Sequence, residues 1–255
     1  MIFLLTTIYR QRFSMNNPTV RLVRFTPDAE QLIAAAAKLC YASDPLTIFL
    51  QSPEEAEVFL FRLRRMGHLS PFEHASYTFL LEGVSRAMTH QLIRHRIASY
   101  SQRSQRYVTH EAFEYIIPPS LQGKQVETGN GMEDATEYYR RFMDHAAEVY
   151  GNLRETLGGS GETANEDARY VLPNAAETKI MVTMNARELF HFASERLCSR
   201  AQWEIRAVAG EMLRLAREAS PVIFKGIGPK CVKLGRCPEG KLSCGKFEEM
   251  REKYK

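Results

Sequence analysis

The chain has 255 residues, 44% of them hydrophobic, which is enough to form one buried core of ordinary domain size. Its 34 basic and 30 acidic residues leave a net charge of +4, an excess too small to indicate nucleic acid or a membrane as a partner. Five cysteines, an odd number without a secretory leader, argue against a disulfide-stabilised scaffold. We therefore expect a globular protein of the cytoplasm.

The first nine residues are largely apolar and are followed by Arg10 and Arg12. A secretory signal would instead begin with basic residues and end at a cleavage site of small residues. The run is also too short to cross a bilayer. We expect residues 1–19 to form an N-terminal extension, with Met15 as a second candidate for the start of the chain.

Hydrophobic periodicity and turn residues predict helices and strands throughout the rest of the chain. The first helix should be capped at Thr26, and the second should begin at Ser52 and stop at Gly67. In chain order we predict a strand from residue 20, helices 29–41 and 53–66, strand 75–81, helix 85–98, a polar loop 99–107, strand 113–118, a glycine-rich loop 121–132, helices 133–157 and 165–173, strand 178–186, and helices 186–199 and 201–219.

This order of elements indicates the α+β class, with a modest, antiparallel-rich central sheet flanked by helices. We find neither internal repeats nor a linker rich in proline and serine, so residues 20–225 should form one domain. Residues 226–255 form a separate tail rich in cysteine, lysine and glycine.

Residues 94–107, RHRIASYSQRSQRY, carry the most chemical information. Arginine stays charged and binds phosphate through two parallel hydrogen bonds, and hydroxyl and amide groups complete such sites. If Arg94, His95 and Arg96 lie at a helix end, they point in different directions and could reach several anionic groups. The segment therefore predicts binding of phosphorylated small molecules. The alternatives are a solvated basic patch or a groove for RNA or single-stranded DNA.

The same segment resembles the R-H-R-x-x-S-x-x-x-x-S-x-R-Y signature of flavin-dependent thymidylate synthases. Seven residues match it: Arg94, His95, Arg96, Ser99, Ser104, Arg106 and Tyr107. Further blocks that resemble the family at the same spacing are residues 67–74 (GHLSPFEH), 168–173 (ARYVLP), 184–187 (MNAR) through Arg196, and 201–206 (AQWEIR). The resemblance covers about residues 20–225.

The resemblance implies an enzyme that converts dUMP to dTMP by reductive methylation. FAD would be the cofactor, methylenetetrahydrofolate the carbon donor and NADPH the reductant. Members of this family form homotetramers whose FAD sites are built from several subunits. The resemblance implies neither nucleic acid nor membrane partners, and no metal ion. A flavoenzyme or nucleotide enzyme with a different reaction remains an alternative.

Individual roles follow from the resemblance, position by position. Arg196 would stabilise the ionised uracil ring and is the expected catalytic residue. The positions implied for dUMP are Gln91, Arg94, Gln102, Arg103, Ser104, Gln105, Arg106, Arg169 and Arg196. The positions implied for FAD are Ser70, Arg94, His95, Arg96, Gln102, Asn185, Arg187 and His191. His68 and Tyr107 fall where folate and NADPH would approach, although Tyr107 could also be a core residue.

We do not expect Gln102 to act as a general base or Ser104 to act as a nucleophile. Many members of the family have Asn-Glu where this chain has Ser101 and Gln102, so Gln102 lacks the charge of a general base and should position the ligand instead. Ser104 has no His-Asp pair assigned to activate it, so we expect it to donate a hydrogen bond to the nucleotide rather than act as a nucleophile.

The tail contains three cysteines, Cys231, Cys237 and Cys244, separated by five and six residues. Zinc sites normally need four ligands and a closely spaced pair, so this pattern alone fits zinc poorly. A disordered tail with free thiols, a metal or iron–sulfur site, and an oxidised pair remain open.

Overall fold

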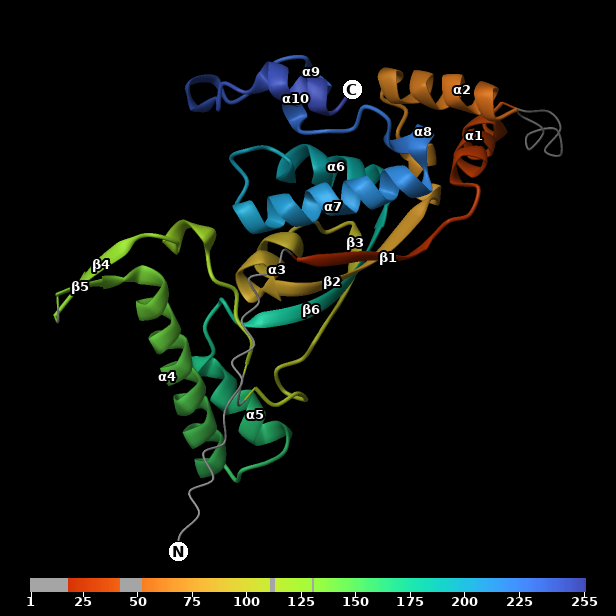
Figure 1. Cartoon of the computed structure of the whole chain (residues 1–255). Coiled ribbons are helices and arrows are strands. Elements are labelled where there is room, and N and C mark those ends of the chain that lie inside the picture. Colours follow the sequence, from red (N-terminus) through yellow and green to blue (C-terminus); the bar gives the residue numbers. More distant parts are fainter. Residues whose placement is uncertain (1–17, 42–51, 111–112, 130) are drawn as a thin grey trace, which may run out of the picture. The chain divides into compact units, whose positions relative to one another are not determined.

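A computed structural model describes residues 18–41, 52–110, 113–129 and 131–255 (Figure 1). Residues 1–17 of the predicted N-terminal extension lie outside the described residues. The described chain divides into two compact units. The larger comprises residues 18–102 and 178–255, and the smaller comprises residues 103–177.

The larger unit is built on a four-stranded sheet with the order β1-β2-β6-β3. The strands are β1 (Thr19–Phe25), β2 (Ser76–Ser85), β6 (Glu177–Asn185) and β3 (Ala98–Gln102). β1 pairs antiparallel with β2, and β3 pairs antiparallel with β6. The predicted antiparallel-rich sheet and the α+β class are therefore confirmed, and the strand predicted at 178–186 is central, as expected.

Helices cover this sheet (Figure 1). α7 (Trp203–Ala219) packs on β1 and β2 and on α6 (Ala186–Arg196). The remaining helices before the tail are α1 (Ala29–Leu39), α2 (Pro53–Met66), the 3-10 helix η2 (Ser70–His74), α3 (Arg86–Leu92) and α8 (Pro221–Phe224). The core includes the fully buried Tyr77, Phe79 and Leu81 of β2 and Phe192 of α6. Each such side chain contributes roughly 1.5–3 kcal/mol through burial.

The helix start signals were read correctly at α2 but not at α1. Ser52 and Glu55 form a capping box, and Gly67 ends α2 with φ 78°. At α1 the N-cap is Asp28 rather than Thr26. The Thr26 hydroxyl instead accepts a hydrogen bond from Ser76 N at 3.0 Å, so it joins the start of β2 to the end of β1.

The smaller unit contains a hairpin and a long helix. The hairpin pairs β4 (Gln125–Thr128) with β5 (Gly131–Asp134), and Asp134 then caps α4 (Ala135–Thr156). Further along are the short α5 (Glu162–Ala168) and the 3-10 helix η4 (Arg169–Val171); a third 3-10 turn, η3 (Pro119–Leu121), precedes the hairpin. The small core of this unit is formed by Phe113, Met143, Ala146 and Ala176.

Four predictions of secondary structure were wrong. The helix predicted over 85–98 ends at Leu92. The Tyr100 hydroxyl lies 2.9 Å from Leu92 O, one of the carbonyls that the end of a helix leaves without a helical partner, and 2.7 Å from His95 O. The first residues of the predicted polar loop 99–107 lie in strand β3, because the backbone of β6 pairs with them irrespective of their polar side chains.

The glycine-rich loop predicted at 121–132 forms most of the β4–β5 hairpin, in which Gly131 adopts φ 105°. The strand predicted at 113–118 is reduced to a single bridge between Tyr115 and Ala176. In both places the partner strand, rather than the local composition, decides the outcome.

The C-terminal tail is folded onto the larger unit. It contains α9 (Lys230–Leu234), the 3-10 helix η5 (Gly240–Leu242) and α10 (Phe247–Lys253), and α9 contacts α6. Tyr254 is buried, and a Cβ on Gly228 would lie 2.7 Å from Tyr254 Cβ, so only glycine fits there.

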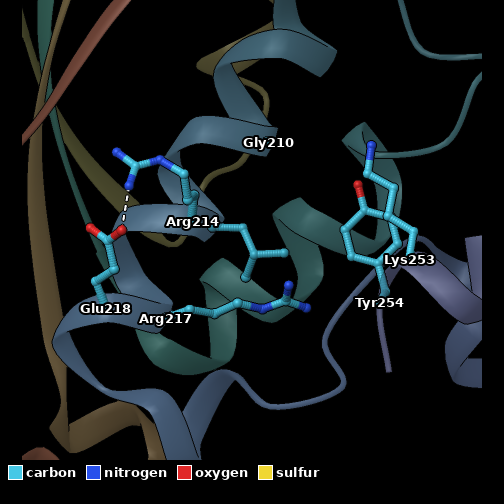
Figure 2. A pocket seen from close by; sticks show the side chains of 7 residues that line it. Gly210, Arg214, Arg217, Glu218, Lys253 and Tyr254 are labelled. Carbon is cyan, nitrogen blue, oxygen red and sulfur yellow. Dashed lines mark hydrogen bonds and ion pairs between the residues drawn. The ribbon is translucent and has the colours of Figure 1, made fainter.

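The end of the tail borders an open pocket of about 460 Å³ on α7, shown in Figure 2. The Arg217 guanidinium lies 5.5 Å from the centroid of the Tyr254 ring and donates a hydrogen bond to Ile227 O at 2.5 Å. These contacts anchor the chain end. Of the helices that the structure describes, none has both the length and the apolar character needed to span a bilayer.

Candidate active site

The larger unit contains a cavity of about 1000 Å³. Its walls come from α2, from the turn after α3, from the end of β6 and the start of α6, and from the chain around residue 227. This volume lies at the upper end of the range for small-molecule sites, and it is adequate for a dinucleotide-sized ligand.

The cavity is lined by many cations. They are Arg64, Arg65, Arg94, Arg96, Arg187 and Lys233. Arg187 pairs with Glu73, whereas Arg94 and Arg96 are exposed and have no ion-pair partner among the residues that the structure describes. Such arginines are well suited to a pyrophosphate.

Most of the positions predicted for FAD meet at this cavity. Arg94, His95, Arg96, Asn185, Arg187 and His191 line it, whereas Ser70 is exposed at the start of η2 and does not. The side-chain oxygen of Asn185 also caps α6 by accepting a hydrogen bond from Glu188 N at 2.8 Å. The fixed start of α6 therefore positions this part of the wall.

His95 links a buried acid to Arg196. Arg196 Nε donates to His95 Nε2 at 3.0 Å, and His95 Nδ1 lies 3.2 Å from Glu188 Oε1. Because Nε2 is the acceptor, the proton of the neutral ring is on Nδ1 and is donated to Glu188. Arg196 also contacts Gln91 O at 3.5 Å, so its guanidinium is held from two sides.

The surroundings keep His95 neutral. It is only 5% exposed, and burial, followed by the charges of Arg196 and His191, lowers its pKa to about 4. Burial also raises the pKa of Glu188. The donor atoms of His95, Glu188 and His191 lie within 4.8 Å of one another, but a cation there would compete with Arg196 for His95. His95, held by Glu188, therefore serves to orient the Arg196 side chain.

Gln102, predicted to position ligands, holds secondary structure together. Its side-chain amide donates to the buried Thr89 hydroxyl at 3.0 Å and lies 3.4 Å from the Thr178 hydroxyl. These bonds connect β3 with α3 and β6. An ionised glutamate at this position could only accept hydrogen bonds, so the threonine hydroxyls would have to act as donors.

In the smaller unit the structure brings Arg106 and Arg169 together at α5. Arg106 pairs with Glu162 and, at 2.8 Å, with Glu166, and Arg169 Nε donates to Glu166 O at 3.1 Å. Ser104 Oγ accepts a hydrogen bond from Arg106 N at 3.1 Å, which leaves its own proton for another acceptor. Gln105 is half-buried in the same turn.

Arg103 has a different environment. It donates to the buried Glu177 side chain at 2.6 Å and to Glu177 O at 3.1 Å, as a structural ion pair does. Tyr107 is 69% exposed, which excludes the core role that its sequence left open. His68 is also exposed, directly after the end of α2.

Several residues of these sites escaped the sequence analysis. Glu188 occupies the third position after an Asn N-cap, where acids are common for capping reasons alone, so nothing marked it as a partner of His95. Glu162 and Glu166 likewise looked like ordinary acids in a short helix. Arg64, Arg65 and Lys233 lie far from the signature segment.

The chain is similar to known proteins over most of its length. A family model described as thymidylate synthase complementing protein matches residues 21–222. The flavin-dependent thymidylate synthase of Clostridium tetani is 47% identical over 241 residues, which cover 92% of this chain and 96% of the relative. The flavin-dependent thymidylate synthase of Geobacter sulfurreducens is 48% identical over 241 residues, which cover 92% of this chain and 97% of the relative.

A solved structure is also similar, that of the UMP/dUMP methylase PolB from Streptomyces cacaoi bound with 5-Br dUMP. Its TM-score is 0.69 at 27% identity, over 84% of this chain and 97% of that one. Fold, site and relatives together define this chain as a methyltransferase enzyme. It belongs to the flavin-dependent thymidylate synthase family.

Proposed function

We propose that this protein methylates dUMP to dTMP, with FAD as cofactor, methylenetetrahydrofolate as carbon donor and NADPH as reductant. Bound flavin would supply the hydride that completes the new methyl group. The relatives' names support the flavin, and the bound nucleotide analogue of the similar structure supports dUMP. A cytoplasmic location and a homotetramer are part of the proposal.

The observation that carries the proposal is the way Arg196 is held. Electron density must build up on the uracil carbon that accepts the new group, and a fixed cation beside the ring nitrogen and oxygens stabilises that charge. Arg196 is oriented by His95 and Gln91 O, both neutral, so its full positive charge is available. We assign to it the activation of the uracil ring.

The remaining residues bind and orient. Arg94 and Arg96, with Arg187, would hold the pyrophosphate of FAD, and the cationic lining of the cavity fits such a group. Arg106 and Arg169 would hold the phosphate of dUMP, with Ser104 as a hydroxyl donor. Tyr107, exposed beside Arg106, is suited to stack on the folate ring.

The direct test measures tritium released from dUMP labelled at the ring carbon that is methylated. Release should require FAD, methylenetetrahydrofolate and NADPH together, and it should fall to background when folate is omitted. UMP belongs in the same assay, because the similar methylase is named for both nucleotides. A purified protein without flavin colour and without tritium release would refute the proposal, and light scattering checks the tetramer.

A further inference from the structure

Four of the five cysteines line one small pocket of the larger unit. Cys198 follows α6, Cys231 lies in α9, and Cys237 and Cys244 lie on either side of η5. The sequence pattern offered three tail thiols, one short of a normal zinc ligand set. Cys198, from the body of the larger unit, completes the set of four.

These thiols are unbonded and line the same pocket. All five cysteines of the chain are free, so no disulfide accounts for the cluster. The pocket has about 20 Å³ of free space, which suits a single ion better than an eight-atom iron–sulfur cluster.

The charges around the pocket also suit an anionic centre. Four thiolates around a divalent ion carry a net charge of −2, and Arg200 and Lys230 line the same pocket. Both are tied to Glu239, with 2.9 Å between Lys230 Nζ and Glu239 Oε1, and Lys230 also lies 3.5 Å from Glu195 at the end of α6. These ion pairs bring the tail cysteines up to Cys198.

The middle of the tail has little buried surface to stabilise it. No residue from 233 to 246 is buried, and Leu234 and Leu242 are 53% and 62% exposed. Ordering a residue costs about 1–2 kcal/mol of backbone entropy. Without burial in this stretch, hydrophobic contacts do not offset that cost, whereas a structural metal contributes folding free energy directly.

We propose that Cys198, Cys231, Cys237 and Cys244 bind one zinc ion, which joins the C-terminal tail to the end of α6. Zinc bound about 2.3 Å from each sulfur brings the sulfurs to about 3.8 Å from one another. Among the described residues, the possible metal-ligand atoms that lie within 4.8 Å of one another are those of His95, Glu188 and His191. The four cysteine sulfurs are therefore farther apart than bound zinc requires, and they must approach the ion by side-chain rotation. The family model ends at residue 222, before the three tail cysteines.

The site also bears on the reaction proposed above, although it does not depend on it. Cys198 lies two residues after Arg196, so the ion would fix the turn in which the helix carrying Arg196 ends. Loss of the ion should lower thermal stability first. Turnover should fall less than in a variant of Arg196 itself.

The test is metal analysis of the full chain, purified without chelators from zinc-supplemented medium. We expect about one zinc per chain in the wild type and less than a tenth of that in Cys237→Ser and Cys244→Ser. Cys40→Ser, an exposed cysteine outside the pocket, is the matched control and should keep its zinc. Cobalt in place of zinc should give ligand-field bands at longer wavelengths than flavin absorption.

If the variants do not fold, measurements on the wild-type protein alone still test the zinc site. A mercurial reagent should release one zinc as the four pocket thiols react. Wild-type protein with substoichiometric zinc and freely titrating thiols would overturn the proposal. So would a disulfide among the four, or iron with acid-labile sulfide in place of zinc. Tritium release from dUMP, measured on the same samples, separates failure of the zinc site from failure of the proposed reaction.

Discussion

Arg196 in the larger unit and Arg106 in the smaller unit are both partly buried arginines assigned to the nucleotide, yet their partners differ in charge. Arg196 is held by the neutral His95 ring and by a backbone carbonyl, whereas Arg106 is paired with Glu162 and Glu166. Glu195, the residue before Arg196, lies 3.5 Å from Lys230. A cation held by neutral groups is available to a developing negative charge, and one held by carboxylates must first exchange partners.

Replacing Arg196 by alanine should have the largest effect. Loss of one preorganised charge at the reacting ring typically lowers turnover about 10²–10³-fold. We expect tritium release from dUMP to fall by at least that factor while bound flavin, measured by visible absorption, is retained. Arg214→Ala is the control, because Arg214 is an exposed residue paired with Glu211 and Glu218. Unchanged turnover would remove Arg196 from the mechanism.

Arg94→Ala tests whether the cavity binds the flavin cofactor. Arg94 lines the cavity without an ion-pair partner among the described residues, so its loss removes a charged hydrogen bond to the pyrophosphate. Such a bond contributes about 1.5–3 kcal/mol, or roughly 10–100-fold in flavin affinity. Gel filtration should separate flavin from the variant. Full retention of colour, as in Arg214→Ala, would contradict the assignment.

Variants of His95 test whether Arg196 must be oriented by a hydrogen bond as well as carry a charge. His95→Leu removes the acceptor of Arg196 Nε and should lower kcat about tenfold, with a smaller change in the KM for dUMP. His95→Gln offers an amide oxygen to Arg196 and an amide N–H to Glu188, and it should recover most of the loss. Equal kcat in the leucine variant and the wild type would show that Arg196 does not need His95.

The same histidine makes stability depend on pH. Its pKa is about 4 when folded and near 6.5 when unfolded, so the unfolded chain binds more protons between these values. The free energy of unfolding should therefore fall as pH decreases from about 6.5 towards 4, by roughly 3 kcal/mol at most. Urea titrations at pH 7 and pH 5 would measure this, and the His95→Gln variant should show a shallower dependence.

Local chemistry decides the elements that were predicted correctly from the sequence. The capping residue Ser52 and Gly67 placed α2, and alternating apolar residues placed the central strand β6. Arg94 and Arg96 of the R-H-R run line the cavity, and their binding of a ligand stays a prediction. The end of α3 was not predicted; there Leu92 O accepts a hydrogen bond from the Tyr100 hydroxyl, eight residues further along the chain.

Tertiary contacts account for the rest. Serine-rich β3 and the glycine-rich hairpin are strands only because a partner strand lies beside each of them. His95 appeared to be a further phosphate ligand, and its bonds to Glu188 and Arg196 connect residues about a hundred positions apart. In the same way the fourth cysteine, Cys198, could not be assigned to the tail before the tail was seen folded against α6.

The smallest expected effect concerns the acids that hold Arg106. Glu162→Gln removes one competitor for its guanidinium and leaves the side chain's size unchanged. Because both groups are about 40% exposed, the ion pair contributes no more than about 1 kcal/mol, so the KM for dUMP should fall by at most about fivefold. Glu137→Gln, at an exposed ion pair on α4, is the matched control. A KM that rises in Glu162→Gln would mean that this carboxylate positions Arg106 for the phosphate, which would make the two arginines more alike than their partners indicate.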